Sequence, residues 1–178
     1  MEAIFNIDAH ILLWIQEYVR SPILDPIMKG ITHLGDGGAI WIALTVILLC
    51  VKRTRRAGIA CAISMVIGLL VTNLVLKNWI ARIRPYEVIQ GLTILIGKPH
   101  DWSFPSGHTT NSFAAAWVMF TMLPQKFGVP ALILAVLICF SRMYVGVHYP
   151  TDILGGIAVG CFAAWCACKA AKKLLPEK

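Results

Sequence analysis

Long apolar runs separated by short polar stretches make up most of this 178-residue chain. Five runs contain few charged residues, and glycine, proline or charged residues bound them. Runs of this kind predict buried or membrane-spanning helices, of which a full crossing needs roughly 20 residues. The five runs cover residues 39–51, 57–77, 109–123, 129–145 and 152–170.

The N-terminal part has a different pattern. Over residues 3–19, polar side chains such as Asp8 and His10 interrupt the apolar positions. Polar groups are costly inside a bilayer, so we expect an interfacial or half-buried helix here. A short helix is predicted over 24–33, and the Gly-Asp-Gly-Gly sequence at 35–38 predicts a turn.

Composition supports a membrane setting. Hydrophobic residues make up 58% of the chain, whereas soluble domains are about 45–50% apolar even when glycine is included. The sequence therefore predicts one membrane-embedded domain over residues 1–178. Its expected fold is an all-α helical bundle of about five to six transmembrane helices plus an N-terminal interfacial helix.

The net charge of +7 does not indicate a nucleic-acid partner, because the basic residues do not form a stripe along one face. They gather instead in the loop at 52–56 and near the C-terminus, as the positive-inside rule describes. Those segments are therefore predicted to be cytoplasmic, and residues 78–108 and 141–152 to lie on the external side. The basic residues concerned are Lys52, Arg53, Arg55, Arg56, Lys169, Lys172, Lys173 and Lys178.

The cysteines do not indicate a metal site or a disulfide framework. All six lie within or at the ends of apolar segments, at spacings unlike those of zinc ligands. We interpret them as apolar packing residues. His100 and Asp101 add no evident metal-ligand set to His108, and we expect His33 to be interfacial.

A polar cluster around His148 is the first candidate for chemistry. Pro150 is tolerated in the first turn of a helix, so a helix is predicted to begin near residues 149–151. Asp152 then lies in that first turn and can accept a hydrogen bond from one ring nitrogen of His148. The other nitrogen would be free to act as a nucleophile. A helix-capping aspartate beside an interfacial histidine is the alternative.

A second cluster, Pro-Ser-Gly-His, precedes the run at 109–123. Backbone amides of Ser106, Gly107 and His108 at a helix N-terminus can bind an anion. His108 is suited to protonate an alkoxide leaving group and later to activate water. Taken alone, the same residues also fit an ordinary N-cap turn.

Three cations complete the candidate set. Lys77 and Arg84 are seven residues apart, so they are expected to share a helix face, and Arg142 at the end of an apolar run needs a partner or a water-filled cavity. Such cations neutralise phosphate oxygens. For Arg82 we favour snorkelling to the lipid headgroups.

Together these clusters resemble the signature of the type 2 phosphatidic acid phosphatase superfamily (PAP2), which includes the vanadium haloperoxidases. That pattern is Lys, six residues, Arg-Pro; then Pro-Ser-Gly-His; then Ser-Arg, five residues, His, three residues, Asp. Residues 77–152 match it in order and without departures.

The resemblance implies a role for each matching residue. His148 would attack phosphorus and become phosphohistidine, Asp152 would orient it, and His108 would act as acid and then base. Neither a metal nor another cofactor is implied. The phosphate-binding residues would be Lys77, Arg84, Ser106, Gly107 and Arg142.

The predicted function is thus a metal-independent phosphatase acting on a lipid phosphate or diphosphate in a bacterial inner membrane. Within the family, undecaprenyl diphosphate, phosphatidylglycerophosphate and phosphatidic acid are the implied substrates, and the site would face the extracytoplasmic side. Three alternatives stay open: a lipid phosphotransferase using the same histidine, a haloperoxidase, and a non-catalytic lipid-binding or transport protein.

Overall fold

The computed structural model describes residues 2–174, and every regular element in that range is a helix. The all-α prediction is therefore confirmed for this part of the chain. Short π-helical or 3₁₀ segments extend or join the α-helices; they are η1 (Ile15–Val19), η2 (Asp36–Gly38) and η3 (Leu70–Leu76). The α-helices are α1 (Glu2–Trp14), α2 (Leu24–Leu34), α3 (Ala39–Cys50), α4 (Arg55–Leu69), α5 (Lys77–Ile80), α6 (Pro85–Val88), α7 (Gly107–Met122), α8 (Gln125–Tyr144) and α9 (Pro150–Leu174).

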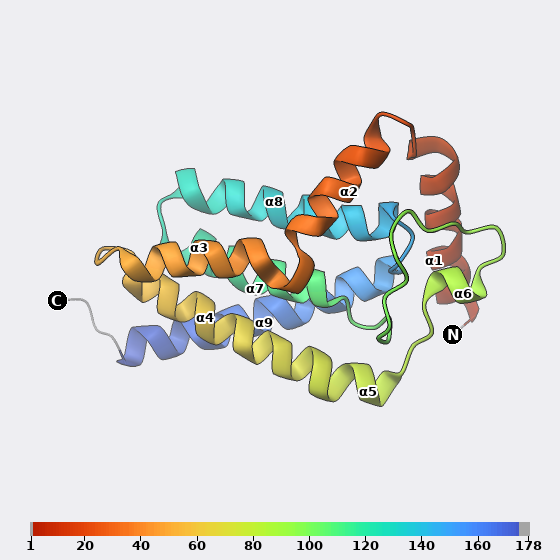
Figure 1. Cartoon of the computed structure of the whole chain (residues 1–178). Helices are drawn as coiled ribbons and strands as arrows, with labels where there is room; N and C mark the ends of the chain where they lie inside the picture. The colour runs from red at the N-terminus through yellow and green to blue at the C-terminus, as the bar shows by residue number, and fades with distance from the viewer. Residues whose placement is uncertain (1, 175–178) are drawn as a thin grey trace.

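A bundle of helices α3, α4, α7, α8 and α9 forms the body of the structure (Figure 1). Helix α7 is central and packs against α4, α8 and α9. Helix α2 leans away from the bundle, and α1 lies across one end of it at a steep angle (Figure 1). That α1 lies at the membrane interface stays a prediction.

Small side chains let the helices approach α7 closely. Its alanines at 114–116 are fully buried. A Cβ atom on Gly160 would lie 2.7 Å from the carbonyl oxygen of Thr110, and one on Gly68 would lie 2.9 Å from the Thr110 side chain. In lipid, where burial of apolar surface does not drive helix association, close packing of this kind holds helices together.

The sides of the bundle carry large apolar residues. Val46 on α3, Val66 on α4, Val136 on α8 and Phe162 on α9 are all more than half exposed. Three helical stretches are long and apolar enough to cross a membrane: Arg55–Val88, Gln125–Tyr144 and Pro150–Lys173. Helices α2 and α3, bent by 47°, form a fourth if they are counted as one span. The chain is an integral membrane protein, and the count of five to six crossings stays a prediction.

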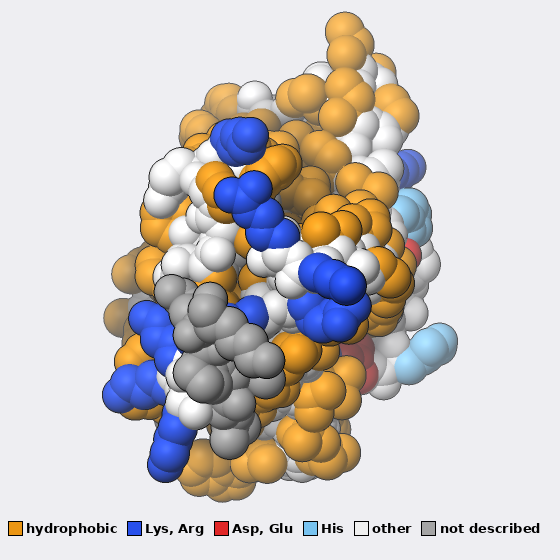
Figure 2. All heavy atoms as spheres, turned by 90° about the vertical axis from the view of Figure 1, so that its left-hand side faces the viewer, with side chains coloured by type: hydrophobic (Ala, Val, Ile, Leu, Met, Phe, Trp, Pro, Cys, Tyr) orange, Lys and Arg blue, Asp and Glu red, His pale blue; other side chains and the backbone are white. Residues whose placement is uncertain are grey.

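Basic side chains gather at the end of the bundle away from α1, as Figure 2 shows. These residues follow α3, begin α8 and end α9, so the basic clusters of the sequence meet on one side of the apolar body. Lys178 lies outside the described residues. The exposed members are Lys52, Arg53, Arg55, Lys126, Lys169, Lys172 and Lys173.

The helix boundaries mostly follow the sequence pattern. Helix α9 begins at Pro150 as predicted, with Asp152 in its first turn. The run predicted to end at residue 77 continues through η3 and α5 to Ile80, where Ala81 adopts a left-handed conformation with φ of 46°. π-Helical turns are often found beside functional sites, and η3 directly precedes Lys77.

The apolar connection over residues 86–100 packs on the bundle. Ile89 and Leu92 are buried against Leu12 of α1 and Tyr149. The amide of Leu95 also donates to the carbonyl oxygen of Val145 at 3.2 Å. This connection and α1 together cover the end of the bundle that holds the polar clusters.

Candidate active site

The three polar clusters of the sequence meet around one cavity of about 250 Å³. It lies at the end of the bundle that α1 covers, where η3 and α5 end, α7 begins, and α8 leads into α9. The cavity therefore joins segments that are far apart in the chain. The predicted site residues that line it are Lys77, Arg84, Gly107, His108, Arg142 and His148.

His148 is buried just before α9, with 2% of its surface exposed. Its Nδ1 lies 3.3 Å from Oδ2 of Asp152, and its Nε2 lies 3.4 Å from Nη1 of Arg84. Burial lowers the pKa of His148 to about 3, although the Asp152 carboxylate opposes the shift. The ring is thus neutral at physiological pH, and Nε2, the nitrogen directed away from Asp152, faces a cation.

Asp152 is fully buried and has several donors. Its Oδ2 accepts from the Ser103 hydroxyl at 2.5 Å and from the Tyr149 amide at 2.9 Å. Its Oδ1 accepts from Nη1 of Arg82 at 2.7 Å. These contacts hold the carboxylate against His148, so Asp152 does more than cap α9.

Arg82 does not snorkel to the lipid headgroups, and that interpretation is wrong. Its guanidinium donates to Asp8 of α1 at 2.7 Å as well as to Asp152. Its Cζ lies 3.7 Å from the centre of the Tyr149 ring. Two buried carboxylates attract the arginine more strongly than a hydrated surface does, because low dielectric strengthens the attraction between charges. Arg82 thereby links α1 to the carboxylate beside His148.

Lys77 and Arg84 are brought together by Asp101, not by a shared helix face. Helix α5 ends at Ile80, and Arg84 lies beyond it in extended backbone before Pro85. Asp101 Oδ1 lies 2.6 Å from Nη2 of Arg84, and Oδ2 contacts Nζ of Lys77. The helix-face prediction for this pair is therefore wrong, although both side chains reach the cavity.

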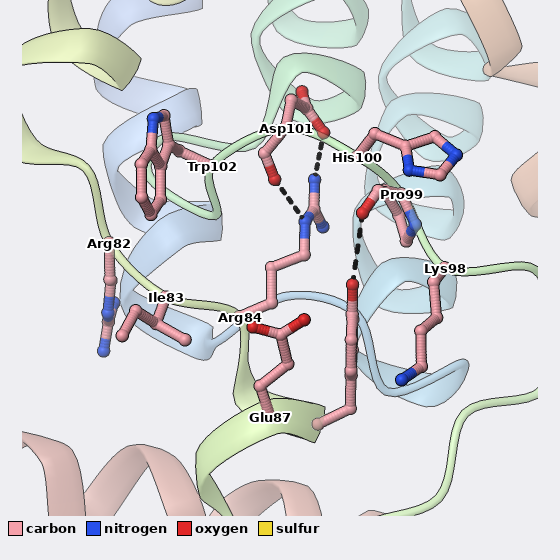
Figure 3. A pocket seen from close by; sticks show the side chains of 10 residues that line it. Arg82, Ile83, Arg84, Glu87, Lys98, Pro99, His100, Asp101 and Trp102 are labelled. Carbon is pink, nitrogen blue, oxygen red and sulfur yellow. Dashed lines mark hydrogen bonds and ion pairs between the residues drawn. The ribbon is translucent and has the colours of Figure 1, made fainter.

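Asp101 is an ionised group at this site. Partial burial disfavours its charge, but Lys77 and Arg84 outweigh that effect and lower the pKa of Asp101 to about 2. Figure 3 shows Arg84 directed at Asp101 in a neighbouring cavity of about 340 Å³, which Lys98 and Trp102 also line. The Asp101 carboxylate thus pairs with two of the cations, Lys77 and Arg84, that are predicted to bind phosphate.

Arg142 and the Ser106–Gly107 turn complete the cavity wall. Arg142 is 3% exposed; its Nη1 donates to Thr32 at 2.6 Å, and its Nε is buried without a hydrogen-bond partner. Ser106 caps α7 through its side chain, and its amide donates to the carbonyl oxygen of Asp152. Ser106 therefore shapes the turn, and Gly107 is the residue of the pair that faces the cavity.

Several residues at the site were not expected from the sequence. Ser103 and Arg82 support Asp152, Asp36 contacts His108, and His33, expected to be interfacial, contacts Asp36. Asn73 and Asn111 line the cavity. Spacing gives a signal for the two asparagines, since Asn73 lies four residues before Lys77 and Asn111 three after His108 on helices. Within residues 2–174, no three side chains of His, Cys, Asp or Glu gather as metal ligands would.

Comparison with known proteins identifies the family. The model of the PAP2 superfamily matches residues 57–175. Over 156 residues the chain is 36% identical to an undecaprenyl-diphosphatase of Sulfolobus acidocaldarius, covering 88% of this chain and 73% of that protein. It is 33% identical over 153 residues to phosphatidylglycerophosphatase B of Bacillus subtilis, covering 80% and 72%.

A solved structure agrees with these similarities. The crystal structure of a transmembrane PAP2-type phosphatidylglycerolphosphate phosphatase from Bacillus subtilis superimposes with a TM-score of 0.81 at 29% identity. The match covers 100% of this chain and 90% of that one. This chain belongs to the PAP2 superfamily, and its predicted class, a membrane-bound phosphoric ester hydrolase, is confirmed.

Proposed function

We propose that this protein hydrolyses a phosphate or diphosphate ester of a membrane lipid by double displacement through His148. The observation that carries the proposal is the cavity in which a neutral, buried imidazole faces three cations. A nucleophilic nitrogen beside cations that neutralise phosphate oxygens is the arrangement that phosphoryl transfer requires. The proposal takes residues 1–178 as one catalytic domain with five to six crossings.

Phosphate binding would use Lys77, Arg84 and Arg142. The unpartnered Nε of Arg142 supplies a buried donor, and donors of this kind stabilise charge on the transferring group without reorganising. Because Gly107 has no side chain, a phosphate can come close to its backbone. A Cβ atom at this position would lie 3.9 Å from Nζ of Lys77. The Ser106 amide is engaged by the carbonyl oxygen of Asp152, so the amides that this turn offers to the same anion at the start of α7 are those of Gly107 and His108.

The chemistry would proceed in two steps. Nε2 of His148 attacks phosphorus while Nδ1 keeps its proton, hydrogen-bonded to Asp152, and the bond to the leaving oxygen breaks as His108 protonates that oxygen. His108 then takes a proton from water, whose oxygen attacks the phosphohistidine and releases inorganic phosphate. Because cations and imidazoles supply the charge stabilisation and the proton transfers, the mechanism needs no metal.

The lipid chain would lie between α3 and α4. An apolar groove of about 350 Å³ runs there and shares Gly37, Leu69 and Asn111 with the phosphate cavity. Its other wall residues are apolar except for the buried Thr45, and Val46 and Val66 among them are exposed on the side of the bundle. A lipid whose phosphate lies in the cavity can therefore extend its apolar chain along this groove toward the bilayer.

The names of the relatives support a choice of substrates to test first. Those matched above are named for undecaprenyl diphosphate and phosphatidylglycerophosphate, so these lipids are the first candidates. The site would face the external side, because it lies at the end of the bundle opposite the basic residues, which the positive-inside rule keeps in the cytoplasm. Thiol or protease probes that reach residues 78–108 only from the cytoplasm would contradict this orientation.

Phosphate release by purified protein in detergent, with EDTA present, tests the proposal. The substrates are undecaprenyl diphosphate, phosphatidylglycerophosphate and phosphatidic acid, and His148→Ala is the control. Turnover that survives EDTA and is lost in the variant is the expected result. Release that needs an acceptor lipid would identify a phosphotransferase, and no turnover on any lipid would contradict hydrolysis.

A further inference from the structure

The Gly35–Gly38 turn between α2 and α3 does more than reverse the chain. It lines the cavity together with the start of α7, next to which it lies in Figure 1. Gly37 and Gly38 have φ values of 58° and 73°, a left-handed conformation that glycine adopts without strain. This backbone directs the one acidic side chain of the turn, that of Asp36, toward His108.

The contact between the turn and His108 is close. Asp36 Oδ1 lies 2.9 Å from Nε2 of His108. A Cβ on Gly35 would lie 2.7 Å from Cδ2 of His108, a distance at which something must shift. Gly35 thus lets the turn lie against the imidazole, and Asp36 holds that ring by its Nε2 atom.

The other oxygen of Asp36 is also held. Its Oδ2 lies 2.7 Å from Nδ1 of His33, on the last turn of α2. His33 is 61% exposed and Asp36 53%, whereas the His108 side chain is 19% exposed. The carboxylate therefore bridges an exposed histidine and a largely enclosed one.

Charge explains why His108 needs this partner. Burial and the nearby cations lower the pKa of His108 to about 4, and the Asp36 carboxylate in contact with the ring opposes that shift. Of the carboxylates in residues 2–174, Asp36 is the one that contacts the ring. The charged and titratable groups that share the cavity with His108 or face it are Lys77, Arg84, Asp101, Arg142, His148 and Asp36.

We propose that Asp36 is a positioning residue for His108, fixing its ring orientation and favouring the protonated form that departure of the lipid oxygen requires. With Nε2 held by Asp36, Nδ1 is the nitrogen that serves the leaving oxygen. His33 holds the carboxylate in place. This role rests on the proposed hydrolysis.

Neither step of the proposed hydrolysis requires the Asp36 carboxylate to gain or lose a proton. In the first step the Nδ1 proton of His108 passes to the leaving oxygen as the bond from that oxygen to phosphorus breaks and the bond to His148 forms. In the second step Nδ1 takes a proton from water as the water oxygen attacks phosphorus and the bond to His148 breaks. Asp36 stays ionised throughout.

A leaving-group comparison tests the role. Asp36→Asn and Asp36→Ala are assayed on a lipid alkyl phosphate, whose oxygen must be protonated to leave, and on p-nitrophenyl phosphate, whose oxygen need not be. We expect kcat to fall about 10- to 100-fold on the alkyl ester and less than threefold on the aryl ester. Inhibition by inorganic phosphate should stay within about twofold of wild type.

Glu17→Gln, an exposed carboxylate on η1, is the matched control and should retain wild-type rates on both esters. His33→Gln should reproduce the alkyl-selective loss in weaker form. On the alkyl ester, kcat falls as the pH rises and His108 loses its proton. In Asp36→Asn this fall should occur at lower pH than in wild type, because His108 loses its proton more readily without the carboxylate. Equal losses on both esters, or no loss on the alkyl ester, would overturn the proposal.

An NMR measurement separates failure of this proposal from failure of the proposed function. Ring ¹⁵N shifts of His108 in detergent-solubilised protein report which nitrogen carries the proton, whether or not any lipid is hydrolysed. Wild type should show a protonated, hydrogen-bonded Nε2, and Asp36→Ala should not. Identical spectra would overturn the role of Asp36, whereas absent turnover with this difference intact would count against the hydrolase proposal alone.

Discussion

Asp101 places its Oδ1 atom 2.6 Å from Nη2 of Arg84, and its other oxygen contacts Lys77. In the proposed reaction this carboxylate makes the contacts that a phosphate oxygen would make, so an incoming phosphate would have to replace it. Its side chain is 53% exposed, while those of Lys77 and Arg84 are 8% and 5% exposed. Asp101 is therefore the exposed member of this group, whereas Lys77 and Arg84 are enclosed by the protein.

Replacing Asp101 with asparagine should strengthen phosphate binding. A hydrogen bond to a charged group contributes about 1.5–3 kcal/mol, and losing a competitor of that kind should lower the inhibition constant of inorganic phosphate about tenfold. Without phosphate the melting temperature should fall, because two buried cations lose their counter-ion, and added phosphate should restore it. Glu87→Gln, exposed beside the same loop, is the control; an unchanged inhibition constant would refute the competition.

Acid should destabilise the protein through His148. Its pKa is about 3 in the folded protein against an ordinary value of 6.5, so between these values the unfolded chain binds the proton and the folded one does not. Stability is retained above about 6.5 and lost toward 3, with a slope of at most about 1.4 kcal/mol per pH unit. Melting temperatures measured from pH 7.5 to 5 should fall more steeply in wild type than in His148→Gln. Parallel curves would contradict this assignment.

Replacing His148, the proposed nucleophile, and Asp152, its carboxylate partner, should have different effects. His148→Ala should abolish turnover and leave the fold intact by circular dichroism. Asp152→Asn should retain phosphate binding but lower kcat about 10²- to 10⁴-fold, because the ring loses the partner that directs Nε2 at phosphorus. Wild-type turnover in His148→Ala would exclude the phosphohistidine mechanism.

Arg82 should matter to both stability and rate. Arg82→Ala leaves two buried carboxylates without their cation, which costs about 3–5 kcal/mol. Asp8→Asn is the milder variant, since Arg82 keeps Asp152; its kcat should fall less than tenfold while phosphate inhibition stays the same. Thermal unfolding and steady-state kinetics measure the two effects, and wild-type stability in Arg82→Ala would show that the bridge is unimportant.

Narrowing the groove between α3 and α4 should select against long lipid chains. Val46→Trp is expected to lower kcat/KM on a long-chain lipid phosphate about tenfold, while a short-chain, water-soluble phosphate is hydrolysed as by wild type. Val136→Trp, on an exposed position of α8, should change neither. Equal losses on both chain lengths would show that the chain lies elsewhere.

Sequence reasoning succeeded where local chemistry decides the structure. Apolar length predicted the bundle helices to within a few residues, and Pro150 predicted the start of α9 because proline is accepted in a first turn. Motif spacing also named six residues that line the cavity. Each of these follows from a residue and its near neighbours.

The failures depend on contacts between distant segments. Arg82 has the sequence context of a snorkelling residue, and only the position of α1 brings Asp8 to it. Lys77 and Arg84 were given a shared helix because the π-helical segment and the left-handed Ala81 leave no mark in the apolar pattern. Asp36 is 72 residues from His108, and no local periodicity could pair them.

The arginine that joins α1 to Asp152 has a consequence for anyone trimming or transplanting this protein. The family match begins at residue 57, so a fragment cut to that boundary would keep all three signature motifs and discard Asp8, Thr32 and Asp36. Arg82 would lose one of its two carboxylate partners, and Arg142 and His108 would lose the side chains that contact them. Such a fragment would keep the complete family signature but lack the N-terminal contacts to its side chains. Because the N-terminal helices make those contacts, a purification tag is better placed at the C-terminus.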